Sequence, residues 1–235
     1  MQETTGHRRL SRQKQIEAIR AMLTNGHRTV FIEPHTFVLW GLACAIWLML
    51  NRLCFSAANF PVLWQRAAFE EISLAGVIAL AAAIDFRVTQ RRRHQRDESY
   101  PFIQRQVGKL SLLLAAVGVA AAFGAWFFSW VVLIFVLWTA IIGLVLFIHG
   151  LFSEQFLEWA GLAVIAVALA TMALNVPVEG TRWLLISTCG VGLPALGLLL
   201  RPLARWPFAL RLFYVLAWAG LVSVVAFLAW RLSSR

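Results

Sequence analysis

Apolar residues follow one another in seven long runs along the chain, and short polar stretches separate these runs. The runs cover residues 35–55, 68–86, 110–128, 131–148, 157–175, 183–200 and 212–230. Because the hydrocarbon core of a bilayer is about 30 Å thick, a helix needs roughly 20 consecutive apolar residues to cross it. Each run is close to this length and carries few charged residues. The pattern therefore predicts an all-α, polytopic transmembrane bundle of about seven spans.

The stretch before the first run is polar and basic, and we expect it to lie in the cytoplasm. Residues 1–34 form this tail, and residues 35–231 form the seven-span domain. Apolar residues recur in the tail at helical spacing, as shown by Ile16, Ile19 and Leu23. This spacing predicts a short amphipathic helix over about residues 10–24. Such a helix lies on the lipid surface or docks a cytoplasmic partner, and both interpretations stay open.

The composition is typical of a membrane protein and leaves little room for another domain. Of the 235 residues, 60% are hydrophobic and 14% are charged, and the mean hydropathy is +0.75. A soluble domain carries about 25% charged residues. The spans, their connections and the tail use almost the whole chain, so we expect no separate soluble enzyme domain. Three cysteines fall singly within or near spans and are expected to act as small apolar residues: Cys44, Cys54 and Cys189.

Lys and Arg residues are distributed unevenly over the two sides of the predicted membrane domain. The net charge is +10, and 16 of the 21 Lys and Arg residues lie in the tail, in the 87–109 loop and between residues 201 and 211. Basic residues gather on the cytoplasmic side of membrane proteins. This rule places the N-terminus in the cytoplasm and the C-terminus outside, in a protein that we expect in the bacterial inner membrane. The same charge is expected to attract anionic lipid headgroups rather than nucleic acid.

The 87–109 loop is the most basic connection between two runs. Its candidate contacts for anionic lipids or for a protein partner are Arg91, Arg92, Arg93 and Arg96. We expect the helix of the second span to continue beyond the membrane into this loop and to break at Tyr100-Pro101, where Pro101 can open the next helix. The arginines would then lie one to two helical turns past the membrane surface, within reach of lipid phosphates.

The run over residues 183–200 has the most irregular composition. It places one proline and three glycines near the middle of the bilayer, namely Gly190, Gly192, Pro194 and Gly197. Proline removes a backbone hydrogen bond and glycine permits close helix approach, so a kink is expected there. Broken helices at this depth form binding sites in many transporters. The other interpretation is a kink that serves packing alone, with Ser187 and Thr188 bonded back to their own helix.

Ionisable residues inside the predicted spans are few, and none forms a catalytic or cofactor-binding set. Glu70 and Glu71 are expected at the start of the second span, where the helix dipole favours anions. Asp85 lies near the other end of the same span. His35 and His149 lie at span ends and do not make the facing pair that a haem requires. We therefore expect no cofactor, no metal site and no enzymatic activity.

These features favour an integral membrane protein that is not an enzyme. We expect it to act as a regulatory or accessory subunit through its basic cytoplasmic face, with lipids and a cytoplasmic or membrane protein as partners. The alternative is a small transporter or permease subunit for an uncharged or lipidic substrate, because the spans lack the mid-membrane charge of ion coupling. An enzyme acting on a lipid inside the membrane ranks last. A homo-oligomer is compatible with the first two interpretations.

Overall fold

The computed structural model describes residues 33–55, 59–95, 102–128, 130–203 and 207–233. Within these ranges 92% of the residues are helical and none lies in a strand. The prediction of an all-α fold is therefore confirmed. The amphipathic helix expected over residues 10–24 lies outside the described residues.

The described helices follow one another along the chain with short connections. They are α2 (Pro34–Cys54), α3 (Leu63–His94), α4 (Phe102–Phe127), α5 (Val131–Phe152), α6 (Gln155–Ala173), α7 (Val178–Ser187), a π-helical turn η1 (Thr188–Gly192), α8 (Leu193–Leu203) and α9 (Phe208–Ser233). Proline at position 34 opens α2, where a missing amide hydrogen leaves no partner unsatisfied. The segments α7, η1 and α8 run on without a break and form one span.

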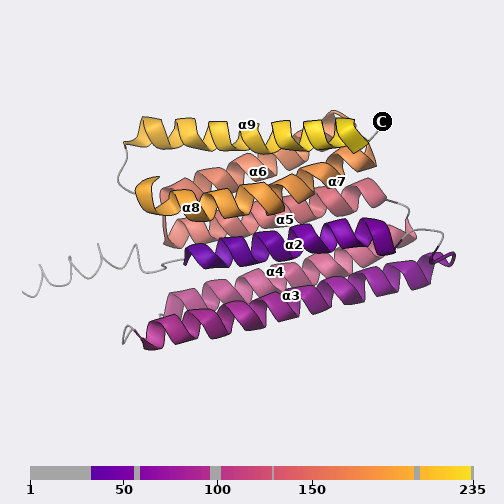
Figure 1. Ribbon diagram of the computed structural model, residues 1–235, viewed down its shortest axis with the longest axis horizontal. Helices are drawn as coiled ribbons and strands as arrows, with labels where there is room; N and C mark the ends of the chain where they lie inside the picture. Colours follow the sequence, from indigo (N-terminus) through magenta and orange to yellow (C-terminus); the bar gives the residue numbers. More distant parts are fainter. Residues whose placement is uncertain (1–32, 56–58, 96–101, 129, 204–206, 234–235) are drawn as a thin grey trace, which may run out of the picture.

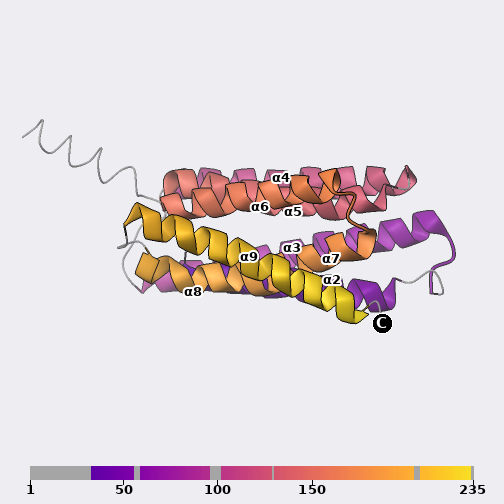
Figure 2. The same cartoon turned by 90° about the horizontal axis from the view of Figure 1, so that it is seen from above.

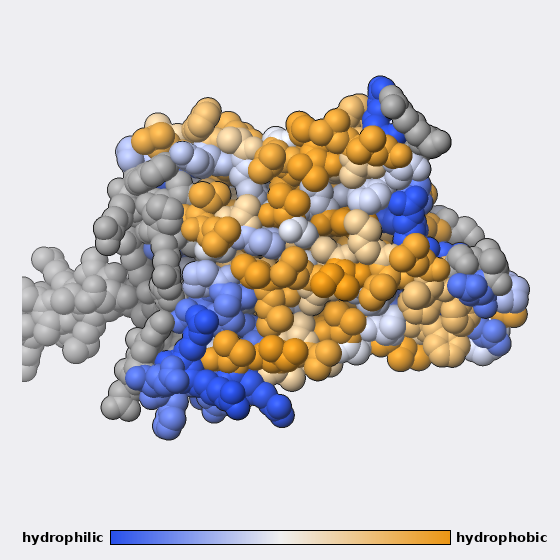
Figure 3. Space-filling model, viewed as in Figure 1, coloured by the Kyte–Doolittle hydropathy of each residue, from blue (hydrophilic) through white to orange (hydrophobic). Residues whose placement is uncertain are grey.

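Seven of these helices or helical segments are long and apolar enough to cross a membrane within the described part of the chain. Many of their large apolar side chains face outward, as Leu53 and Leu198 do with 72% and 74% of their surface exposed. Figure 3 shows a broad hydrophobic surface along the helices and hydrophilic residues gathered mainly at the end where α3 finishes. The chain is therefore a multi-pass integral membrane protein.

The helices lie side by side in two layers (Figure 1, Figure 2). One layer contains α4, α5 and α6. The other contains α3, α2, the α7–η1–α8 span and α9, in this order. Contacts between α3 and α4, between α5 and α7, and between α6 and α9 join the two layers.

Helix α3 is longer than the run that predicted it. It begins at Leu63, five residues before the expected start, and continues to His94, as the expected extension into the 87–109 loop requires. Its 32 residues span about 48 Å at 1.5 Å per residue, against a bilayer core of about 30 Å. The next helix begins at Phe102, immediately after Pro101. The connection between the two spans is therefore much shorter than the 87–109 loop.

The closest helix pair is α5 and α6, which are joined by a very short turn. Gly143 and Gly161 let the two backbones meet, because a methyl group built on Gly143 would lie 2.8 Å from the Gly161 carbonyl oxygen. At the end of the pair, a methyl group on Gly150 would lie 2.6 Å from the Cα atom of Glu158. Small residues at helix interfaces permit this approach in a bilayer. This pair forms the rigid rear layer of the bundle together with α4.

Candidate functional site

Polar side chains inside the bundle are concentrated where α2 lies against α3. These two helices are antiparallel, and pairs of side chains link them near both ends. We call the end where α2 begins and α3 finishes the basic end. We call the other end, where α2 finishes and α3 begins, the opposite end.

At the basic end, the carboxylate of Asp85 is the centre of a hydrogen-bonded cluster. Thr36 Oγ1 donates to Asp85 Oδ1 at 2.8 Å, and Trp40 Nε1 donates to Asp85 Oδ2 at 3.4 Å. His35 Nε2 lies 3.5 Å from Asp85 Oδ1 and 3.4 Å from Thr89 Oγ1. The carboxylate thus has donors on both oxygens. This cluster fixes the start of α2 to α3 just inside the arginine-rich segment.

The predicted arginine contacts lie on the last two turns of α3. Arg91 and Arg92 are exposed, as is Arg87 one turn earlier. Arg92 Nη1 also lies 3.6 Å from Glu33 Oε2, and only 3% of the Glu33 side chain is exposed. Helix α3 therefore carries these three exposed arginines on its last turns, and the contact with Glu33 positions one of them, Arg92. The side chain of Arg93 and the whole of Arg96 lie outside the part of the chain that the structure describes.

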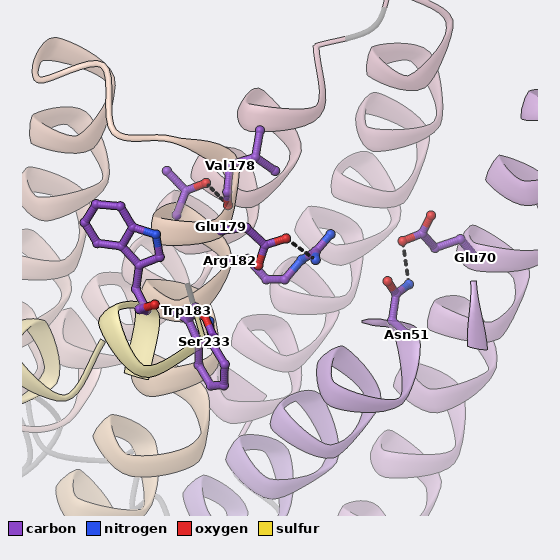
Figure 4. Close-up of polar contacts among 9 residues, drawn as sticks. Asn51, Glu70, Val178, Glu179, Arg182, Trp183 and Ser233 are labelled. Carbon is purple, nitrogen blue, oxygen red and sulfur yellow. Dashed lines mark hydrogen bonds and ion pairs between the residues drawn. The ribbon is translucent and has the colours of Figure 1, made fainter. Parts of the chain in front are cut away.

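The opposite end of the same helix pair holds a second polar cluster. Asn51 Nδ2 donates to Glu70 Oε1, as Figure 4 shows. One turn further along, Trp47 Nε1 donates to Ser73 Oγ at 3.1 Å, and Ser73 Oγ donates to the Glu70 carbonyl at 2.8 Å. The Asn51 and Glu70 side chains are both buried, with 4% and 7% of their surface exposed. A buried carboxylate is thus held between α2 and α3.

Two arginines approach this carboxylate from α3 and α7. Arg66 and Arg182 both act on Glu70 electrostatically. The guanidinium carbon of Arg66 lies 5.2 Å from the Trp126 ring centroid, which is a cation–π distance. Arg182 Nη1 donates to Glu179 Oε1 at 2.8 Å, and in Figure 4 it extends from that pair toward Asn51 and Glu70. Arg182 thus lies between a half-exposed ion pair with Glu179 and the buried Asn51–Glu70 pair. We call the six ionisable or amide side chains of this end the glutamate site: Asn51, Arg66, Glu70, Glu71, Glu179 and Arg182.

The placement of Glu70 and Glu71 corrects the expectation that they begin the second span. Because α3 starts at Leu63, both glutamates lie two turns inside the helix rather than at its first turn. Only 6% of the Glu71 surface is exposed. Glu70 Oε2, Glu71 Oε2 and Arg66 Nε are buried and accept or donate no hydrogen bond within the described residues. The helix dipole alone does not explain carboxylates at this depth.

The two polar clusters are separated by an apolar stretch. Between Ser73 and Asp85, helix α3 carries only aliphatic residues and one glycine, and α2 carries no charged residue between Trp40 and Trp47. The 12 residues from Ser73 to Asp85 correspond to about 18 Å of helix. The clusters at the two ends are therefore distinct sites rather than parts of one polar path along this helix pair.

The predicted kink in the sixth span is a π-helical turn. The amide of Leu193 bonds the Thr188 carbonyl, five residues earlier, and Pro194 follows directly. The Gly192 carbonyl oxygen accepts a hydrogen bond of 3.0 Å from Trp218 Nε1 on α9. π-helical turns of this kind often occur at functional sites. In this protein, however, the Gly192 carbonyl oxygen already accepts the hydrogen bond from α9.

The other glycines of the kink let neighbouring helices approach closely. A methyl group on Gly190 would lie 3.1 Å from Ala45 Cβ, and one on Gly197 would lie 2.8 Å from the Pro34 carbonyl oxygen. Both neighbours belong to α2. The candidate kink residues are thus in contact with α2 and α9, and their geometry is that of a packing site.

Two of the three cysteines meet beside this turn. Cys189 on η1 is fully buried, and Cys44 on α2 packs into the same apolar cluster with its thiol in contact with the Cys189 thiol. Cys44 and Cys189 are 145 residues apart in the sequence, and no motif there predicts that they meet. Within the described residues, no three His, Cys, Asp or Glu side chains are arranged to hold a metal ion.

Comparison of the chain with family models gives no match. Comparisons with curated proteins and with solved structures also give no significant match.

Proposed function

We propose that the protein is a non-enzymatic regulatory or accessory subunit of the bacterial inner membrane that acts through its basic end. In this proposal the basic end and the N-terminus face the cytoplasm, and the C-terminus lies outside. The orientation is supported by the count of 16 of 21 Lys and Arg residues on that side. The odd number of candidate spans in the described residues, seven, supports termini on opposite sides.

The observation that carries this proposal is the continuation of α3 to His94, past the level at which α2 begins. Arg87, Arg91 and Arg92 are exposed on it, and the Glu33 and Asp85 contacts hold it against the start of α2. Guanidinium groups bind phosphate oxygens through several hydrogen bonds at once. Three exposed arginines on the last turns of one helix suit the phosphates of anionic lipid headgroups and an acidic surface on a partner protein.

The test is purification of the tagged protein from its native membrane in mild detergent, followed by mass spectrometry of the bound lipids and proteins. We expect a stoichiometric partner and anionic lipid in the wild type, and loss of both in the Arg91→Glu/Arg92→Glu variant. Lipid retention should fall by more than about tenfold, because each basic residue near an anionic surface contributes about 1 kcal/mol. Arg52→Glu, an exposed charge reversal at the opposite end, serves as the matched control and should retain both.

The second candidate is a small transporter or permease subunit for an uncharged or lipidic substrate. The buried glutamate site favours it, since charged side chains inside the membrane commonly mark transport pathways. A purified homo-oligomer that carries only a lipid or a small molecule would support this candidate. The same result, with no protein partner in the wild type, would overturn the accessory-subunit proposal.

A further inference from the structure

The glutamate site contains more carboxylates than it contains positive groups to neutralise them. It combines three carboxylates with two guanidinium groups, namely Glu70, Glu71, Glu179, Arg66 and Arg182. Arg182 is engaged with Glu179 at 2.8 Å, and Arg66 stacks on the Trp126 ring. When all five groups are ionised, one negative charge is therefore left over, and it lies among Glu70 and Glu71.

Glu71 is the member of the site without a hydrogen-bond partner in the described residues. Its side chain is 6% exposed and its Oε2 atom receives no donor, and the neighbouring Glu70 uses Oε1 for Asn51 while Oε2 receives none. Burial of an unpaired carboxylate costs several kcal/mol even after the protein relaxes. Two adjacent carboxylates repel each other as well. A positive ligand between or beside them removes both penalties.

An apolar groove lies one helical turn from Glu71. A groove of about 250 Å³ opens at the opposite end, where the first turns of α3 meet the end of α4. Its walls are Val62, Leu63, Trp64, Ala67, Trp126 and Phe127. Trp126 is the ring on which Arg66 lies, and Ala67 is one turn from Glu71 on the same helix. Glu71 therefore lies one turn from the floor of this groove, although neither glutamate lines it.

We propose that Glu70 and Glu71, near the opposite end of the bundle, bind a single positive charge, either a proton or one alkali cation. Asn51 on α2 orients Glu70, while Arg66 on α3 and Arg182 and Glu179 on α7 set the charge around the pair. Helices α4 and α5 contribute aromatic walls, Trp126 and Phe135, which lie under the two guanidinium groups. This site is distinct from the basic end and does not depend on the proposed function.

The test is labelling of the purified wild-type protein in nanodiscs with dicyclohexylcarbodiimide, followed by peptide mass spectrometry. This apolar reagent enters the bilayer and adds to protonated carboxyl groups, whose proton passes to a carbodiimide nitrogen. We expect labelling at Glu70 or Glu71 that falls about tenfold per pH unit once most of the site is deprotonated. Protection by Na⁺ or K⁺ at constant pH and ionic strength identifies an alkali cation, and dependence on pH alone identifies a proton.

Glutamine variants give an independent measurement. The apparent melting temperature of the wild type is expected to change with pH or with Na⁺, and Glu71→Gln and Glu70→Gln are expected to lose this dependence. Glu154→Gln, a carboxylate at the basic end, is the matched control and should keep it. If the glutamine variants do not fold, the wild-type labelling decides alone. Absence of label on Glu70 and Glu71 at every pH, or label that responds to neither pH nor cations, would overturn the proposal.

Discussion

Two antiparallel helix pairs in this protein are held together by different means. Helices α5 and α6 meet through Gly143, Gly150 and Gly161, which bring backbone against backbone. Helices α2 and α3 meet through side-chain hydrogen bonds at both ends, with Asp85 at the basic end and Glu70 at the opposite end. Both pairs are consecutive in the chain, so connectivity does not explain the difference.

The difference shows how stability and chemistry are divided in the bundle. Lipid tails are as apolar as leucine, so helices in a bilayer associate through close packing or through hydrogen bonds between side chains. At its three glycines the α5–α6 pair is held by close backbone packing. The polar pair buries carboxylates in the bundle, where ionisable side chains are costly and commonly mark a functional site. We therefore expect stability to depend most on α5 and α6, and function to reside along α2 and α3.

The largest effect on stability should come from the glycine pair. A methyl group at Gly161 would meet the Gly143 carbonyl oxygen at 2.5 Å and the Phe147 Cα atom at 2.8 Å. Backbone atoms cannot move aside as a flexible side chain does, so α5 and α6 must separate. We expect Gly161→Ala to lower the free energy of unfolding by about 3 kcal/mol, the upper part of the range for overpacking. Unfolding in mixed micelles of increasing SDS content measures the change.

Two other glycines supply the control for this substitution. Gly76 and Gly124 lie in α3 and α4, and a methyl group on either would meet nothing within 4 Å. Alanine favours a helix over glycine by about 1 kcal/mol, so Gly76→Ala and Gly124→Ala should be neutral or stabilising. An equal decrease in the free energy of unfolding at Gly161 and at these two positions would show that the α5–α6 contact does not stabilise the bundle more than other parts of the helices.

The fold could be predicted from the sequence because the bilayer limits what apolar runs can do. Each of the seven runs became a helix, and the run that starts at residue 131 begins at the predicted residue. The predicted helix ends were less accurate. The start of α3 was placed too late because Trp64, Gln65 and Arg66 lower the hydropathy of residues 63–67. The early start of α3 places Glu70 and Glu71 two turns inside the helix, and packing against neighbouring helices buries them.

The glutamate site was missed because its members come from three separate helices. In the sequence, Arg182 is one of the five basic residues on the less basic side, and Asn51 is a single polar residue near the end of the first apolar run. One signal in the sequence could have found the contact between Asn51 and Glu70. The connection between α2 and α3 is short, so the two helices must be antiparallel, and a register that pairs Thr36 with Asp85 also pairs Asn51 with Glu70. Side-chain partners across other interfaces need the three-dimensional structure.

The polar pair should give a smaller loss of stability that a second substitution can cancel. Asn51→Leu leaves the buried Glu70 carboxylate without a donor on either oxygen, and we expect it to cost about 2 kcal/mol. Asn51→Leu/Glu70→Leu removes both partners and should recover most of this loss, since two apolar groups leave nothing unsatisfied. A double-mutant cycle from SDS unfolding gives the coupling energy. Additive losses would mean that the two side chains do not interact.

The smallest effect on the free energy of unfolding is expected at η1. Close glycine packing and a side-chain hydrogen bond both act on this turn. Gly190 and Gly197 approach α2 closely, while Trp218 Nε1 donates to the Gly192 carbonyl from α9. Trp218→Phe keeps most of the ring contacts and removes only the donor, so we expect a loss of about 1 kcal/mol in the free energy of unfolding. Ser187→Ala, which removes a 2.8 Å bond to the Val222 carbonyl, provides a comparison on the same interface. If Trp218→Phe destabilises the protein as strongly as Gly161→Ala, the π-helical turn depends on hydrogen bonding rather than on packing, and the kink belongs with the polar helix pair.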